Sequence, residues 1–166
     1  MLALLLAACS TDTSRVEVRL VTALVAGPEF RLVQTDVLER AEPGAPLRVA
    51  DSNEAVARAN VDYSLGRAVA SFNLAHGTYL LRVRLLRPSG ALLVERLVSV
   101  TVAADAIVSV HITRDCVGVQ CPEPGGSLAF ATCLAGRCVD PRCSQESAEF
   151  CPTLAFCHDP TECSDV

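Results

Sequence analysis

The distribution of cysteine divides this chain of 166 residues into two parts. One of the nine cysteines stands at position 9, and no other occurs before position 116. The remaining eight share residues 116–166: Cys116, Cys121, Cys133, Cys138, Cys143, Cys151, Cys157 and Cys163. An even number of clustered cysteines is typical of a disulfide framework in an oxidising compartment. We therefore predict four bridges, whose pairing the sequence leaves open.

Residues 116–166 contain few large apolar side chains, while proline, glycine and serine recur. Such a segment cannot offset its conformational entropy by forming a core alone. Disulfides, each worth about 2–4 kcal/mol, supply the missing stability. Zinc is the alternative, because the four-residue gaps between cysteines lie at the loose end of zinc-ligand spacing and His158 follows Cys157. An oxidising compartment favours disulfides, so we expect a small, loop-dominated segment without a metal or other cofactor.

The N-terminus has the pattern of a secretory signal. Residues 1–8 are apolar, and a polar stretch begins at Ser10. Eight residues are too few to span a bilayer, which takes about 20, but they suit the apolar region and cleavage site of a signal peptide. No basic residue precedes this run, whereas signal peptides begin with a positive segment. We therefore expect the true start of translation to lie upstream.

The order Leu6-Ala7-Ala8-Cys9 resembles the bacterial lipobox, in which an aliphatic and two small residues precede the cysteine that receives lipid. The resemblance implies that residues 1–8 are a signal peptide, that Cys9 is lipidated and that residues 9–14 are a tether. Ser10 follows the cysteine where an aspartate would retain a lipoprotein in the inner membrane, so the outer membrane is the expected location. Lipidation of Cys9 also leaves an even number of cysteines for bridges.

Residues 15–115 alternate between apolar and polar residues with a period of two, which is typical of half-buried strands. Residues 87–90, Arg-Pro-Ser-Gly, suit a tight hairpin. The region 51–60 could be an edge strand or a short capped helix. The sequence predicts an all-β fold, an antiparallel β-sandwich of about seven strands. The clearest strands are 16–20, 30–38, 67–74, 79–85, 94–102 and 108–112.

Residues 71–83, Ser-Phe-Asn-Leu-Ala-His-Gly-Thr-Tyr-Leu-Leu-Arg-Val, resemble a motif of immunoglobulin-like and prealbumin-like bacterial modules, where a glycine turn and a Thr-Tyr pair open a strand. The order of lipobox, sandwich and cysteine-rich segment resembles surface lipoproteins of myxobacteria. The alanine-rich composition of this chain, in which all 14 basic residues are arginine, is consistent with the high-GC genome of such bacteria. The resemblance implies a surface lipoprotein and assigns no chemistry.

Charge is unevenly distributed along the chain. Residues 1–115 hold 12 arginines and 12 acidic residues, so all of the formal charge of −5 belongs to residues 116–166. Without a clustered basic face, we do not expect nucleic acid as a partner. An odd number of strands also predicts that the chain enters the sandwich at one end and leaves at the other. The acidic segment would then lie about 20–30 Å from the lipid, the length of one strand.

No catalytic motif stands out. His76, His111 and His158 lack the context of a serine hydrolase, and phosphate-loop, zinc-protease and calcium-loop patterns are missing from the sequence. We therefore predict a non-enzymatic binding, interaction or structural module that meets an envelope or extracellular protein or glycan. The alternative is a protease inhibitor that presents Arg137 or Arg142 in a disulfide-braced loop, where rigidity reduces the entropy lost on binding. An accessory to an envelope hydrolase is a weaker alternative.

Overall fold

A computed structural model describes residues 12–40, 45–144 and 147–151. Cys9, Cys157, Cys163, His158 and the predicted signal peptide lie outside these residues. The described chain contains strands and two short 3₁₀ turns, η1 (Arg114–Cys116) and η2 (Ala148–Phe150). The strands are β1 (Thr13–Val21), β2 (Leu32–Arg40), β3 (Leu47–Val56), β4 (Arg67–Ala75), β5 (Gly77–Leu86), β6 (Leu92–Val102), β7 (Ala106–His111), β8 (Thr132–Leu134) and β9 (Arg137–Val139). Within this part of the chain, no helix is long and apolar enough to cross a membrane.

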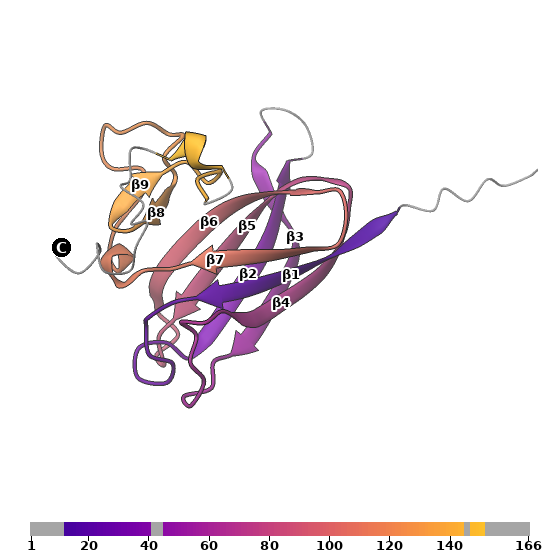
Figure 1. Cartoon of the computed structure of the whole chain (residues 1–166). Coiled ribbons are helices and arrows are strands. Elements are labelled where there is room, and N and C mark those ends of the chain that lie inside the picture. The colour runs from indigo at the N-terminus through magenta and orange to yellow at the C-terminus, as the bar shows by residue number, and fades with distance from the viewer. Residues whose placement is uncertain (1–11, 41–44, 145–146, 152–166) are drawn as a thin grey trace, which may run out of the picture.

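The first seven strands form the predicted β-sandwich (Figure 1). One sheet has the order β4-β1-β7 and the other the order β3-β2-β5-β6. All pairs are antiparallel except β1 and β7, which run parallel because the chain traverses the sandwich an odd number of times. The predicted fold class, a sandwich followed by a disulfide-rich segment, is confirmed.

Apolar and polar residues alternate along the strands, and the apolar ones form the core between the two sheets. On β1, Val16, Val18 and Leu20 are fully buried, while the residues between them are exposed or half-buried. On β5, Leu81 and Val83 are likewise buried. Each sheet thus presents an apolar face to the other, which is the arrangement that a period of two predicts.

The ambiguous region 51–60 is an edge strand up to Val56, where β3 ends, and a loop from residue 57 on. Strand β3 pairs with β2 on one side only, from Leu47 to Val56. Eight of its ten residues are exposed, and only Asn53 and Ala55 are half-buried. An edge strand with so little burial carries no clear alternation, which is why its sequence pattern is weak.

The chain enters and leaves the sandwich at opposite ends (Figure 1). We call the end at which β1 finishes the far end. It carries the loops 22–31, 57–66 and 87–91, and the segment after β7 starts from it. The chain therefore leaves β7 at the end opposite the start of β1, as expected. The cysteine-rich segment then folds back along the edge of β6, where it is bonded to Leu97 and Ser99, so it does not stand wholly beyond the far end.

Three disulfides brace the cysteine-rich segment: Cys116–Cys133, Cys121–Cys138 and Cys143–Cys151. The first two join the two strands of the β8–β9 hairpin, at Cys133 and Cys138, to the residues that follow β7. The hairpin turns at Ala135 and Gly136, whose φ angles of 48° and 71° suit a two-residue turn between twisted strands.

The described part of residues 116–151 packs against the edge of β6. The backbone N–H of Leu97 donates to Oγ1 of Thr132 at 2.8 Å, and that of Ser99 donates to the carbonyl oxygen of Pro141 at 2.9 Å. Cys116 and Cys133 are 2% and 5% exposed and belong to the core of the sandwich. The segment therefore satisfies edge groups that would otherwise be free to pair with another chain.

Arg96 stabilises the contact between β6 and the disulfide-rich segment. Its side chain lies on the inner face of β6 opposite Val83, and its guanidinium donates to the carbonyl oxygens of Cys133 at 2.8 Å and Cys143 at 3.2 Å. Arg96 is 3% exposed and has no carboxylate partner among the described residues, so burial lowers its pKa to about 10. A buried cation whose donors face carbonyl oxygens fixes where the disulfide-rich segment lies.

We expect the mass of the unreduced protein to fall about eight hydrogens below that of the fully reduced form, which corresponds to four bridges. Three of these are the pairs seen here. The fourth would join Cys157 to Cys163, the two cysteines of residues 116–166 that lie outside the described residues. Peptide mapping without reduction tests the pairing, and free thiols or one equivalent of zinc would contradict it.

Candidate binding cleft

Arg142, one of the two predicted inhibitor residues, is held in place rather than presented. Its guanidinium donates to both carboxylate oxygens of Asp140, at 3.0 and 2.7 Å, and lies 4.0 Å from the ring centre of Phe150. These hydrogen bonds hold the pKa of Asp140 below its usual value. A guanidinium that is bonded to a carboxylate along its edge and lies over an aromatic ring is poorly suited to enter the pocket of a protease.

Arg137, the other predicted inhibitor residue, is exposed at the start of β9. Its neighbour Cys138 is tied to Cys121, and the described residues offer the guanidinium no hydrogen-bond or ion-pair partner. It borders a shallow hollow with Pro122, Glu123 and Phe130. Arg137 is therefore the only one of the two arginines that the described structure leaves free for a partner.

The histidines within the described residues do not come together. His76 lies near the start of β1, where its ring Nε2 is 3.3 Å from Oγ of Ser14. His111 ends β7 at the far end, and burial together with the charge of Arg96 lowers its pKa. The two rings thus belong to opposite ends of the sandwich.

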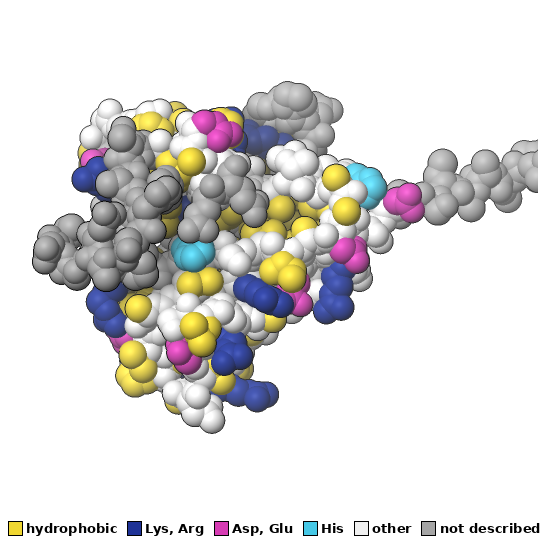
Figure 2. All heavy atoms as spheres, viewed as in Figure 1, with side chains coloured by type: hydrophobic (Ala, Val, Ile, Leu, Met, Phe, Trp, Pro, Cys, Tyr) yellow, Lys and Arg dark blue, Asp and Glu magenta, His cyan; other side chains and the backbone are white. Residues whose placement is uncertain are grey.

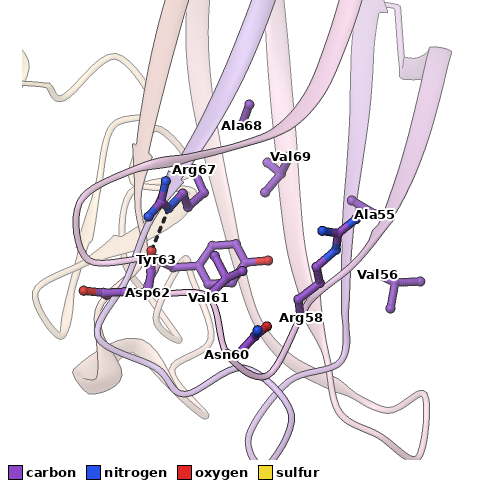
Figure 3. Close-up of a pocket in the computed structure, with 10 residues that line it drawn as sticks. All are labelled: Ala55, Val56, Arg58, Asn60, Val61, Asp62, Tyr63, Arg67, Ala68 and Val69. Atoms are coloured by element: carbon purple, nitrogen blue, oxygen red, sulfur yellow. Dashed lines mark hydrogen bonds between the residues drawn. The ribbon is translucent and has the colours of Figure 1, made fainter.

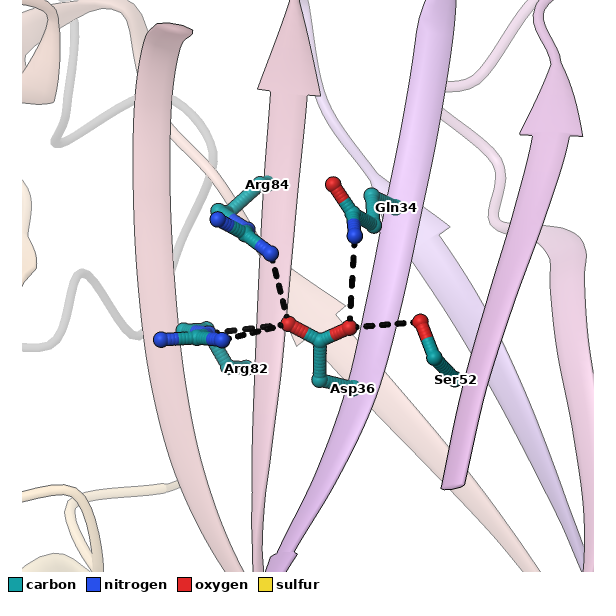
Figure 4. A network of polar contacts seen from close by, with 5 residues as sticks. All are labelled: Gln34, Asp36, Ser52, Arg82 and Arg84. Atoms are coloured by element: carbon teal, nitrogen blue, oxygen red, sulfur yellow. Dashed lines mark hydrogen bonds and ion pairs between the residues drawn. The ribbon is translucent and has the colours of Figure 1, made fainter. Parts of the chain in front are cut away.

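A polar cluster on the outer face of the four-stranded sheet is centred on Asp36 of β2 (Figure 4). One carboxylate oxygen accepts hydrogen bonds from Arg82 and Arg84, each at 2.7 Å, and the other accepts from Ser52 at 2.7 Å. Asp36 is 1% exposed. Burial opposes its ionisation, but Ser52 and the two arginines outweigh that effect and lower its pKa. The carboxylate of Asp36 is occupied by these neighbours, and Nε of Arg84 is buried without a partner among the described residues, so the cluster stabilises the sheet and leaves no free carboxylate for a ligand.

Acidic and basic side chains alternate elsewhere on the sandwich. On the face drawn in Figure 2, arginines over β1 and β4 are interspersed with acidic side chains rather than gathered into one patch. Arg19 and Glu17 of β1, for example, lie 2.7 Å apart. This face therefore has no patch of positive or negative charge that would attract a strongly charged partner.

A hollow lies between the end of β3 and the start of β4, at the far end (Figure 3). Its volume is about 570 Å³, within the range typical of small-molecule sites. Ala55 and Val56 of β3 form one side and Ala68 and Val69 of β4 another. The loop between the strands adds Arg58, Asn60, Val61, Asp62 and Tyr63, and Arg67 opens β4.

Backbone hydrogen bonds hold the loop that forms the cleft. The carbonyl oxygen of Tyr63 accepts from the N–H groups of Thr22 and Gly66, each at 3.2 Å. Asp62 accepts the N–H of Ser64 at 2.8 Å, which lowers the pKa of its carboxyl, and Arg67 donates through Nε to the carbonyl oxygen of Asp62 at 3.0 Å. The loop is therefore fixed before any ligand arrives.

Tyr63 is the central side chain of the cleft. It is 7% exposed, and its ring packs edge-on against Phe30 with 5.5 Å between ring centres. Figure 3 shows its hydroxyl pointing to the side of the cleft where Val69 and Arg58 lie. No hydrogen-bond partner for this hydroxyl occurs within the described residues. The hydroxyl is not among the fully buried polar atoms of the described structure, so it is accessible to a bound molecule from the cleft.

The other polar groups of the cleft are also mostly hydrogen-bond donors. The guanidinium of Arg58 and the amide of Asn60 have no partner in the described part of the chain. Arg67 uses only its Nε, which donates to the carbonyl oxygen of Asp62. No carboxylate of the described residues pairs with its terminal nitrogens. The arrangement suits an anionic group attached to a partly apolar body.

Sequence patterns did not reveal this cleft, because most of its residues lie between positions 55 and 63, where alternation fails. A usable signal exists in retrospect. Tyr63 is one of only seven aromatic residues in the chain, and two arginines, Arg58 and Arg67, flank it in a loop. A scarce aromatic residue in a loop between two arginines indicates a polar site with an apolar floor.

Comparisons with protein-family models, with curated proteins and with solved structures find no match to this chain, so its function has to be inferred from the chemistry of the cleft.

Proposed function

We propose that this protein is a non-enzymatic binding module of the cell envelope, held to the outer membrane by lipid on Cys9, with the cleft around Tyr63 as its ligand site. The observation that carries the proposal is a preformed cleft in which the hydroxyl of Tyr63 and the guanidinium of Arg58 have no hydrogen-bond partner in the described chain, and in which Arg67 uses only its Nε. Three disulfides independently indicate an oxidising, extracytoplasmic environment.

The placement of the cleft supports a role at a surface. It lies at the far end, whereas β1 begins at the other end, four residues after Cys9. A lipid on Cys9 would therefore direct the cleft away from the membrane. Three acyl chains hold a protein durably, because each buried CH₂ contributes about 0.8 kcal/mol.

Replacing Cys9 by serine should move the protein from the membrane to the aqueous phase. The reason is that the lipid supplies the attachment in this proposal, since the described structure has no membrane-spanning helix. Partition between detergent and water, with the chain expressed from its full start, measures the change. A Cys9→Ser protein that still enters the detergent phase would show that another segment carries the attachment.

Binding is tested with envelope preparations of the producing organism and the Cys9→Ser protein. We expect saturable retention that falls at least tenfold in the double variant Arg58→Gln/Arg67→Gln, because the cleft loses both cations. Arg87→Gln is the matched control, since Arg87 is an exposed arginine of the neighbouring far-end turn and does not line the cleft. Equal retention of all three proteins would exclude the cleft as the ligand site.

A second candidate function is protease inhibition through Arg137. The observation in its favour is an exposed arginine beside a bridged cysteine, at the start of a short hairpin. If it holds, the protein inhibits trypsin stoichiometrically, Arg137→Ala abolishes inhibition and Arg142→Ala leaves it unchanged. Cleavage after Arg137 without inhibition would identify a substrate rather than an inhibitor.

A further inference from the structure

The two edges of the four-stranded sheet differ in a way that bears on the cleft. The edge of β6 is covered by the disulfide-rich segment, which accepts its N–H groups at Leu97 and Ser99. The edge of β3 has no strand beside it in the described structure. An edge strand whose backbone groups pair with a neighbour on one side only is a template for an added strand; in β3 the N–H of Ser52 is already bonded to the carboxylate of Asp51.

The exposed side chains of β3 favour such an addition. Val49 and Val56 are 52% and 66% exposed, although valine is usually buried in strands. Charged side chains protect many edges, but here Glu54 is the only charged residue between Ser52 and Val56, the half of the strand nearest the cleft. This half of the edge is therefore neither covered nor strongly charged.

The edge of β3 leads directly into the cleft, because Ala55 and Val56 belong to both. Beyond Val56 the chain turns into the loop that places Arg58 and Tyr63. A strand lying beside β3 would thus have one of its ends next to the unpartnered guanidinium of Arg58 and hydroxyl of Tyr63 (Figure 3).

We propose that the edge of β3 and the cleft form one site for an extended peptide, which pairs with β3 and places its C-terminal carboxylate between Arg58 and Arg67. This assignment rests on the proposed function and names its ligand class. The charged groups around the cleft determine the direction in which the peptide runs along β3. Since β3 runs toward the cleft, only a strand parallel to β3 brings its carboxyl end there.

The chemistry of the contact is complementary. A carboxylate accepts hydrogen bonds from guanidinium groups in a bidentate geometry, and the tyrosine hydroxyl can donate a further one. The apolar walls formed by Val61 and Val69 suit a small aliphatic last residue. An N-terminal ammonium, by contrast, would meet two cations and no free carboxylate other than Asp62, which already accepts from Ser64.

The test uses the Cys9→Ser protein with its bridges formed and the peptide acetyl-Thr-Val-Ser-Val with a free carboxylate. In an amide NMR titration we expect shifts confined to β3 and residues 57–67. The same peptide ending in an amide should bind at least tenfold more weakly, because the carboxylate is lost. A version N-methylated at alternate residues keeps the carboxylate but cannot donate to β3, and it should also bind at least tenfold more weakly.

Matched protein variants complete the test. Arg58→Gln/Arg67→Gln should reduce the affinity for the acid peptide at least tenfold and leave that for the amide unchanged, while Arg87→Gln should alter neither. Equal binding of acid and amide, full binding of the N-methylated peptide, shifts at another edge, or no binding would each overturn the peptide assignment. If the cleft variants still lose envelope retention in that case, the proposed function stands and only the ligand class is wrong. If retention is unaffected by them, the proposed function fails as well.

Discussion

Replacement of Asp36 by alanine should lower the free energy of unfolding by about 3–5 kcal/mol, the cost typical of removing one partner from a buried ion pair. Asp36 is 1% exposed and is the common acceptor for Arg82, Arg84 and Ser52. Without it, two partly buried guanidinium groups on adjacent positions of one strand face repel each other with no carboxylate between them. Urea unfolding at neutral pH measures the change.

Glu39→Ala provides the control on the same strand. Glu39 also pairs with an arginine at 2.7 Å, but Arg48 is 66% exposed, so water screens the interaction. Its loss should cost less than about 1 kcal/mol. Equal effects of the two substitutions would show that burial adds nothing to the Asp36 cluster.

The same cluster predicts loss of stability in acid. The pKa of Asp36 in the folded protein lies below its ordinary value of 3.8, so the unfolded chain binds its proton first as the pH falls. Its contribution is therefore complete above about pH 4 and disappears as the pH drops through the lowered pKa. Glu29, Asp62 and Asp140, whose pKa values are also lowered, act in the same direction. The free energy of unfolding of Asp36→Ala should fall less between pH 5 and pH 2 than that of the parent protein.

The fold was largely predictable because strands with one face in the core must alternate. The periods around Val16–Leu20 and Tyr79–Leu85 matched β1 and β5, since both strands lie inside their sheets and bury every second residue. Strand β3 could not be assigned firmly from the sequence, because it lies at the edge of its sheet. An edge strand with eight exposed residues is under little pressure to alternate.

The cleft and the position of the disulfide-rich segment could not be predicted for a different reason, because both depend on contacts between residues far apart in the sequence. Thr132 meets Leu97, and Arg96 reaches the carbonyl oxygens of Cys133 and Cys143 across more than 30 residues. The alternation of Val94 and Val98 places Arg96 on the inner face, but nothing in the local sequence indicates what would accept hydrogen bonds from a buried guanidinium there. The even number of cysteines in residues 116–166 likewise predicted how many bridges to expect but not which cysteines pair.

Removal of the Cys116–Cys133 bridge by the double substitution to alanine should lower the free energy of unfolding by about 4–5 kcal/mol. Closing a loop with a sequence separation of 17 contributes about 3 kcal/mol through the entropy of the unfolded chain. The further 1–2 kcal/mol, approximately, come from two sulfur atoms lost from the core, because both cysteines are almost fully buried among sandwich residues.

The Cys121–Cys138 bridge separates these two contributions. Its sequence separation is also 17, so the loop term is the same, but both cysteines are half-buried. Cys121→Ala/Cys138→Ala should therefore cost only about 3 kcal/mol. Urea unfolding of the two double variants and the parent protein gives the comparison directly.

Hydrogen exchange then shows whether the Cys116–Cys133 bridge holds the disulfide-rich segment against β6. In the parent protein the N–H groups of Leu97 and Ser99 are bonded to that segment and should exchange slowly. Loss of the Cys116–Cys133 bridge removes the anchor closest to Thr132, so these two amides should lose protection while Val83, inside the sheet, keeps it. Once open, the β6 edge would offer the same free backbone groups as β3, and the variant should self-associate as its concentration rises. A monomeric variant with unchanged exchange at Leu97 and Ser99 would mean that the hydrogen bonds of Arg96 hold the segment in place without the disulfide.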